Sequence, residues 1–177
     1  IGLAEDHEAG FGNFLRRALF NDLPFKSVHY LFNSESDPEM ICERYSRLLE
    51  KYPPDLVLLG VGENGHLAFN DPAVADFADP QLVKIVELDD VCRMQQVNDG
   101  CFASFEEVPE RAITLTMRAL LEVKEKVTVV PGKAKAPAID RMLNGEISTE
   151  CPASILRTTK NTALYLDADS ASQAGLN

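Results

Sequence analysis

Apolar positions along the chain recur with two different spacings. A spacing of three and four residues is typical of an amphipathic helix, and it predicts helices over residues 8–21, 38–52, 90–98, 117–121 and 133–143. Runs of apolar and β-branched residues predict strands over residues 27–32, 55–60, 82–88, 112–116, 126–130 and 163–166. Because helices and strands alternate, the pattern predicts an α/β fold: a single-domain, three-layer open sheet of the Rossmann-like kind, mostly parallel, with helices on both faces.

Local signals mark several element ends. Asp37 stands directly before Pro38, which is the arrangement of an N-cap followed by proline at the first helical position. Asp89 is a second candidate N-cap, for the helix over residues 90–98. In the first predicted helix, Phe11 and Phe14 fall on one face, so we expect that face to pack on the core.

The strand at residues 55–60 leads into the segment that holds most of the candidate chemistry. Its apolar run, Leu56–Leu59, lacks polar alternation, which predicts a strand buried on both faces. Three glycines follow and allow a sharp turn or a close approach to a ligand: Gly60, Gly62 and Gly65. Polar side chains come next: Asn64, His66, Asn70 and Asp71. Since ligands in open α/β sheets bind beyond the carboxyl ends of the strands, we expect a site here.

Two other interpretations of this segment are open. The three glycines match the G-x-G-x-x-G fingerprint of dinucleotide binding, and Glu87 lies near the expected position of the ribose-binding acid. That fingerprint requires a helix at the last glycine, whereas Pro72 and Pro80 interrupt the segment, and proline inside a helix costs about 3 kcal/mol. The nucleotide interpretation is therefore disfavoured. The plainer alternative is a surface loop with a solvated histidine.

Residues 59–72, with the sequence LGVGENGHLAFNDP, resemble the signature of the glucosamine-6-phosphate deaminase (isomerase) family. That family belongs to the superfamily that also holds 6-phosphogluconolactonase, and the resemblance extends from Ile1 to Arg157. The segment from Phe69 to Pro72 favours the deaminase side, because a lactonase is expected to continue with Thr-Ala-Ser-Leu-Phe-Pro. The resemblance implies ring opening, aldose–ketose isomerisation and deamination of an amino-sugar 6-phosphate, giving fructose 6-phosphate and ammonia, with no cofactor.

The resemblance also implies roles for the polar side chains of this segment. His66 corresponds to the catalytic histidine that passes a proton to the ring oxygen, and an unperturbed histidine titrates near neutral pH. Two residues that orient this histidine in the family are commonly Asp and Glu, and this chain has Asn64 and Asp71 in their places. Asn64 lacks the negative charge of Asp, and Asp71 is one methylene group shorter than Glu. Gly62 and Gly65 are candidate substrate-binding positions. We expect this loop to be exposed at the edge of the sheet.

A phosphate group needs donors at a turn or at a helix N-terminus. The segment from Pro131 to Lys135 begins a helix after a strand, and by resemblance Lys135 is the phosphate-contacting lysine, with Lys133 as an additional charge. Solvated surface lysines are the alternative. The family's second contact is often an arginine where this chain has Asn98; Arg93 and Arg157 are weaker candidates.

Other functions therefore stay open. One alternative is a different hexose-phosphate isomerase or a 6-phosphogluconolactonase-type hydrolase. Another is a non-catalytic sugar-phosphate-binding sensor, which Asn64 and Asn98 suggest. By resemblance we also expect residues 1–177 to form one domain without the family's N-terminal part. The base that moves a proton between C1 and C2 is expected in that part, and Glu5 and Asp6 are expected to be surface charges.

Charge and cysteine content restrict the partners. The chain carries a formal net charge of −11, and such a field repels nucleic acid and anionic membrane surfaces. The expected partner is a small-molecule sugar phosphate, and a homo-oligomer is left open. Four cysteines without a C-x-x-C pair, and three separated histidines, predict no metal site and indicate a cytoplasmic protein.

Overall fold

The structure is a computed structural model, and it describes residues 1, 3, 7–31 and 37–175. Its α-helices are α1 (Phe11–Leu15), α2 (Pro38–Lys51), α3 (Asp90–Asn98), α4 (Met117–Leu121) and α5 (Ala136–Asn144). Its strands are β1 (Leu56–Leu59), β2 (Val83–Glu87), β3 (Arg111–Leu115), β4 (Glu125–Val130) and β5 (Thr162–Leu166). A π-helix (η1, Arg16–Phe20) continues α1, and 3₁₀ turns cover η2 (Phe105–Glu107), η3 (Lys133–Lys135) and η4 (Pro152–Thr158).

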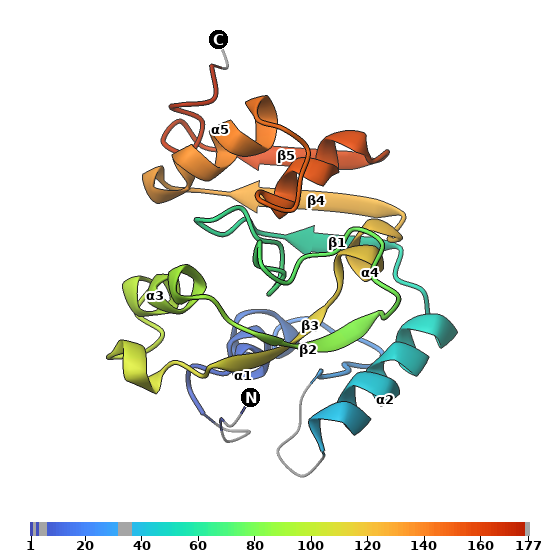
Figure 1. Cartoon of the computed structure of the whole chain (residues 1–177). Coiled ribbons are helices and arrows are strands. Elements are labelled where there is room, and N and C mark those ends of the chain that lie inside the picture. Colours follow the sequence, from blue (N-terminus) through green and yellow to red (C-terminus); the bar gives the residue numbers. More distant parts are fainter. Residues whose placement is uncertain (2, 4–6, 32–36, 176–177) are drawn as a thin grey trace.

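The strands form two sheets (Figure 1). The larger sheet has the order β1-β4-β5, and both of its strand pairs are parallel. Strands β2 and β3 form a separate antiparallel pair. The predicted α/β fold with a parallel sheet flanked by helices is confirmed, and the antiparallel pair is the departure from a wholly parallel arrangement.

The capping signals act as predicted. The Asp37 side chain accepts a hydrogen bond from the backbone N–H of Glu39 at 3.0 Å, at the start of α2. Asp89 caps α3 by accepting from the backbone N–H of Cys92 at 2.7 Å. These bonds satisfy backbone donors that the first helical turn leaves unpaired, so each helix begins at the residue that the sequence indicates.

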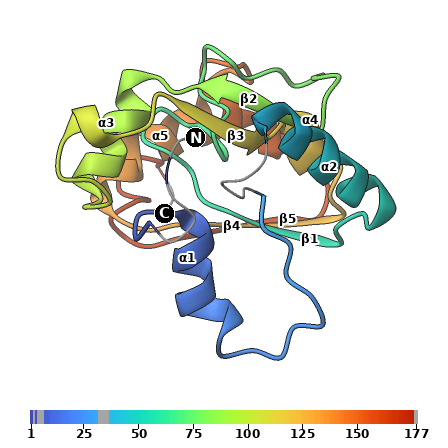
Figure 2. The ribbon, with the colours of Figure 1, turned by 90° about the horizontal axis from the view of Figure 1, so that it is seen from below.

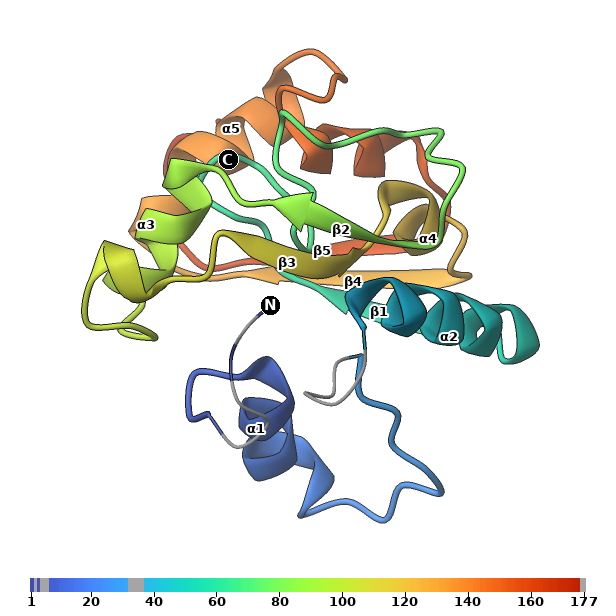
Figure 3. The same ribbon diagram turned by 60° about the horizontal axis from the view of Figure 1, so that its bottom comes forward.

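One face of the larger sheet carries the main core. Helix α5 and the η4 turn lie along this face (Figure 3), and their apolar side chains pack against the ends of β1 and β4. The buried members of this cluster include Leu59, Val130, Ile139, Met142 and Leu156. A smaller cluster holds α2 against the antiparallel pair through Ile41, Cys42, Val83 and Ile113.

The opposite face of the larger sheet is exposed, so the prediction that β1 is buried on both faces is wrong for the described residues. Leu56 is 49% exposed and Leu58 is 69% exposed, whereas Leu59 is buried. Successive side chains of a strand point to opposite faces, and the described elements cover only one of them. An unbroken apolar run does not reveal this difference.

The first predicted helix also departs from expectation. Helix α1 and η1 occupy much of the predicted range, but Phe11 is 57% exposed and Phe14 is 56% exposed. Figures 2 and 3 show α1 on the side of the sheet away from α5. Helical spacing shows that a helix has an apolar face, but it does not show what covers that face.

The predicted strand at residues 27–32 is wrong for residues 27–31, which form no strand, and residue 32 lies outside the described residues. Among the residues that the structure describes, no helix combines the length and the apolar character needed to cross a membrane.

Candidate active site

The candidate site is built on the loop of residues 60–72, here called the His66 loop, which leaves the carboxyl end of β1. The loop folds back on itself, because the backbone N–H of Gly62 donates to the carbonyl of His66 at 3.0 Å. Two helices hold its tip: Gln95 of α3 accepts from the backbone N–H of Glu63 at 3.0 Å, and Arg141 of α5 donates to the Glu63 carbonyl at 3.0 Å. Asn70 ties the far end to β3 by donating to the Leu115 carbonyl at 2.8 Å.

These contacts bury the loop, so the expectation of an exposed loop is wrong. His66 is 9% exposed and Asp71 is 1% exposed. The physical reason is long-range packing, since strands and helices far along the chain close over the segment. A side chain in such a place is oriented by its protein neighbours rather than by solvent.

The His66 ring is held through Nδ1. This atom lies 2.8 Å from Asn64 Oδ1 and 2.9 Å from Asp71 Oδ1. Asn64 Oδ1 also accepts from the backbone N–H of His66 at 3.0 Å, and both neighbours of Nδ1 are oxygen acceptors. The arrangement therefore favours the tautomer with the proton on Nδ1, and it leaves Nε2 as the nitrogen that can exchange a proton.

The Asp71 carboxylate is kept ionised although it is buried. Burial by itself raises the pKa of Asp71, but hydrogen bonds from His66 and Asn64 and the charge of the imidazolium outweigh it and leave the pKa below the ordinary value. The backbone N–H of Asp89 adds a longer contact of 3.4 Å to Asp71 Oδ2. A carboxylate in this state can stabilise a positive charge that develops on His66.

Asn64 does more than orient the ring. Its amide Nδ2 donates to Asp71 Oδ1 at 3.0 Å and to Asp89 Oδ2 at 2.9 Å. Asp89 therefore serves both as the N-cap of α3 and as a partner of the His66 loop. The cap was evident from the sequence, but the second contact, across 25 residues, had no sequence signal.

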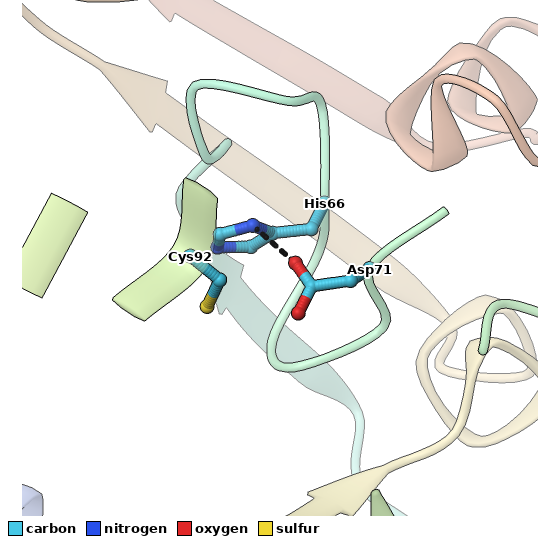
Figure 4. Close-up of side chains that lie close together, drawn as sticks. All are labelled: His66, Asp71 and Cys92. Atoms are coloured by element: carbon cyan, nitrogen blue, oxygen red, sulfur yellow. Dashed lines mark ion pairs between the residues drawn. The ribbon is translucent and has the colours of Figure 1, made fainter. Parts of the chain in front are cut away.

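Cys92 is a neighbour that sequence reasoning missed. Its thiol lies beside His66 and Asp71 in Figure 4, although α3 supplies it from more than twenty residues further along the chain. The side chain is 1% exposed. Burial, followed by the negative charges of Asp71 and Asp89, raises the pKa of the thiol far above its ordinary value. Cys92 is thus a neutral thiol in the protein as it stands.

Two glycines of the loop have packing explanations. A Cβ on Gly62 would overlap the His66 ring, so the imidazole lies directly over the Gly62 backbone. Gly65 has a φ of +88°, and a Cβ there would meet Cys151 Sγ at 2.6 Å. Glycine is therefore required at both positions whether or not a ligand approaches them. Substrate contact at Gly62 and Gly65 stays a prediction.

The two lysines of the 133–135 turn differ. Lys133 is exposed, whereas the Lys135 ammonium is buried and has no hydrogen-bond partner among the described residues. Lys135 also lies close enough to Cys92 for its charge to lower the pKa of that thiol in part. The structure thus turns the Lys135 ammonium inward, within electrostatic range of Cys92, and leaves Lys133 at the surface.

The arginines have structural partners instead. Arg93 donates to the carbonyls of Phe105 and Val108, both at 3.0 Å, and stacks over the Phe105 ring. Arg157 donates to the carbonyls of Leu143 and Gly145 after α5. Asn98 is exposed at the end of α3, and Glu5 and Asp6 lie outside the described residues.

Comparison with known proteins identifies the family. A sequence model described as glucosamine-6-phosphate isomerases/6-phosphogluconolactonase matches residues 3–165, which is most of the chain. The chain belongs to this family. A glucosamine-6-phosphate deaminase of Exiguobacterium sibiricum is 34% identical over 172 residues, covering 97% of the chain and 66% of the relative. A deaminase of the same name from Bacillus cereus strain B4264 is 36% identical, covering 97% of the chain and 64% of the relative. The chain therefore spans slightly less than two thirds of these family members.

Solved structures of the family agree with the fold. A monomeric glucosamine-6-phosphate deaminase is 30% identical with a TM-score of 0.88, covering 97% of this chain and 70% of that chain. The 6-phosphogluconolactonase of Trypanosoma brucei is 20% identical with a TM-score of 0.68, covering 90% of this chain and 66% of that chain. At that lower identity the lactonase shows a shared fold alone.

Proposed function

We propose that this chain acts on an amino-sugar 6-phosphate, opening its ring, isomerising aldose to ketose and releasing ammonia, with glucosamine 6-phosphate as substrate and fructose 6-phosphate as product. One observation carries the proposal: a histidine is paired with a buried carboxylate, and a buried ammonium without a partner among the described residues lies within electrostatic range of Cys92 beside them. The deaminase names of the relatives that are 34% and 36% identical support the choice of substrate.

His66 is the residue we assign to ring opening. Nδ1 is occupied by Asn64 and Asp71, so Nε2 is the atom that gives a proton to the ring oxygen and later recovers it. Asp71 stabilises the imidazolium form that begins this step, and Asn64 positions both groups. Holding the ring from one side in this way fixes its orientation toward the substrate.

Lys135 is the residue we assign to the phosphate. An ammonium that is withdrawn from solvent without a partner is costly, and a phosphate oxygen would supply the missing acceptor. Lys133 is exposed, and we assign it only a long-range contribution. We name no residue of this chain for the proton transfer between C1 and C2.

Ammonia release from glucosamine 6-phosphate tests the proposal. We expect release with glucosamine 6-phosphate and much less with unphosphorylated glucosamine. Hydrolysis of 6-phosphogluconolactone in the absence of ammonia release would contradict the proposal in favour of a lactonase. Phosphate-dependent binding without either reaction would contradict it in favour of a sensor.

A further inference from the structure

Three side chains of different chemistry converge beside the His66 loop. They are His66, Asp71 and Cys92, with exposed fractions of 9%, 1% and 1%. Each offers one ligand atom, and these atoms all lie within 4.8 Å of one another. Figure 4 shows the thiol of Cys92 and the carboxylate of Asp71 close to the same imidazole ring.

An imidazole nitrogen, a carboxylate oxygen and a thiolate sulfur are the three ligand types that Zn²⁺ uses in proteins. Three protein ligands leave a fourth tetrahedral position for water or another small ligand. We propose that His66, Asp71 and Cys92 form a three-ligand binding site for Zn²⁺. The sequence alone does not predict this site, because Cys92 reaches the loop only through the packing of α3.

Zinc needs only small shifts of the ligand atoms, since His66 Nδ1 and Asp71 Oδ1, now 2.9 Å apart, must separate slightly and the widest pair must approach. Zinc lies roughly 2.0–2.3 Å from nitrogen, oxygen and sulfur ligands, so the ligand atoms of a tetrahedral site are roughly 3.3–3.8 Å apart. The widest separation in this cluster is at most 4.8 Å, so it exceeds that range by no more than about 1 Å. Cys92 lies in the first turn of α3, so its side chain can shorten this distance by a rotamer change without moving the loop.

The local charges favour a cation. Asp71 and the Cys92 thiolate supply two negative charges to the metal, and the Asp89 carboxylate lies next to them through Asn64. The Lys135 ammonium is an opposing charge near the cluster. Binding expels the thiol proton of Cys92 to solvent. Zinc takes the place of the proton between His66 Nδ1 and Asp71, and the neutral imidazole then carries its proton on Nε2.

Zinc binding at this site would also affect catalysis, a consequence that rests on the proposed function. Zinc on His66 Nδ1 and Asp71 would break the pair that stabilises the imidazolium and would leave the imidazole proton on Nε2. His66 could then no longer exchange a proton through Nε2, so Zn²⁺ would inhibit ammonia release. Zinc binding itself is measured without substrate, so the failure of the proposed reaction would leave the metal site intact.

The test is a Zn²⁺ titration against a coloured competing chelator. The background protein carries Cys101→Ser, because Cys101 is an exposed thiol that could bind metal by itself. We expect Cys92→Ser in this background to lower Zn²⁺ affinity about tenfold or more, since even outer residues of metal sites contribute that much. Cys42→Ser is the matched control, as it removes another buried thiol and should leave the affinity unchanged.

A second variant and a spectrum complete the test. His66→Gln changes the loop rather than α3, so it tests the same site if Cys92→Ser fails to fold. Co²⁺ in place of Zn²⁺ should give a thiolate-to-metal charge-transfer band that Cys92→Ser abolishes and Cys42→Ser retains. Equal zinc affinity in the background protein and in either site variant would overturn the proposal, and so would a Co²⁺ complex without that band.

Discussion

The two faces of the β1-β4-β5 sheet differ, although the same strands supply both. On one face Leu59 and Val130 are buried under α5 and η4, and on the other Leu58 and Val129 are 69% and 51% exposed. The His66 loop leaves the end of β1 and is held by residues of α3, α5 and β3. The candidate site therefore depends on the face of the sheet that α5 and η4 cover, where neighbouring helices and strands hold the His66 loop in place.

The largest expected effect is on catalysis. If ring opening needs His66, His66→Gln should lower turnover by a factor of roughly 10²–10⁴. Because His66 is buried, the variant must be shown to be folded by circular dichroism before its rate is interpreted. Leu58→Ala, on the open face of β1, is the control and should keep its turnover. Normal turnover in folded His66→Gln would remove His66 from the mechanism.

The next largest effect is on the free energy of unfolding, which should depend on which face of the β1-β4-β5 sheet a substitution changes. Ile139→Ala, at a fully buried position of α5, should lower the free energy of unfolding by about 2–5 kcal/mol. Leu58→Ala should lower it by about 0.5 kcal/mol or less, because that side chain is 69% exposed. Urea unfolding of both variants measures the difference. Equal losses would show that the open face is covered in solution.

The third effect is on KM, and it should differ between the two lysines of the 133–135 turn. Lys135→Ala should raise KM for the phosphorylated sugar by about tenfold or more, since a hydrogen bond to a charged group contributes about 1.5–3 kcal/mol. Lys133→Ala should change KM much less, because Lys133 is exposed. Initial rates on phosphorylated and unphosphorylated sugars measure the contrast. The same KM change in both variants would contradict the distinction.

The smallest effect is a pH dependence of stability from Asp71. Because the folded state lowers the pKa of this carboxyl, its stabilising contribution is present above the ordinary carboxyl pKa of about 4 and is lost as the pH falls through the lowered value. Asp71→Asn should therefore be less stable than the natural chain at neutral pH, and the gap should narrow below about pH 4. Unfolding curves across that range measure the gap. A gap that is constant with pH would mean that the ionised form of Asp71 contributes no stability.

The sequence by itself determined those features of this protein that depend on interactions between residues close together in the chain. Asp37 and Asp89 set the starts of α2 and α3 because a cap needs only a side chain and the next few backbone N–H groups. The grouping of Asn64, His66 and Asp71 was also predictable, since they lie within eight consecutive positions that glycines allow to fold together. Their roles in a reaction stay a proposal.

Only the tertiary structure decided the remaining features, because they depend on contacts between distant segments. It placed Cys92 and Asp89 against the His66 loop, and it turned Lys135 inward while Lys133 stayed exposed. It also decided which face of β1 is covered, and it left Phe11 and Phe14 exposed despite their helical spacing. A one-dimensional pattern records which side chains share a face, but the partner of that face comes from elsewhere in the chain.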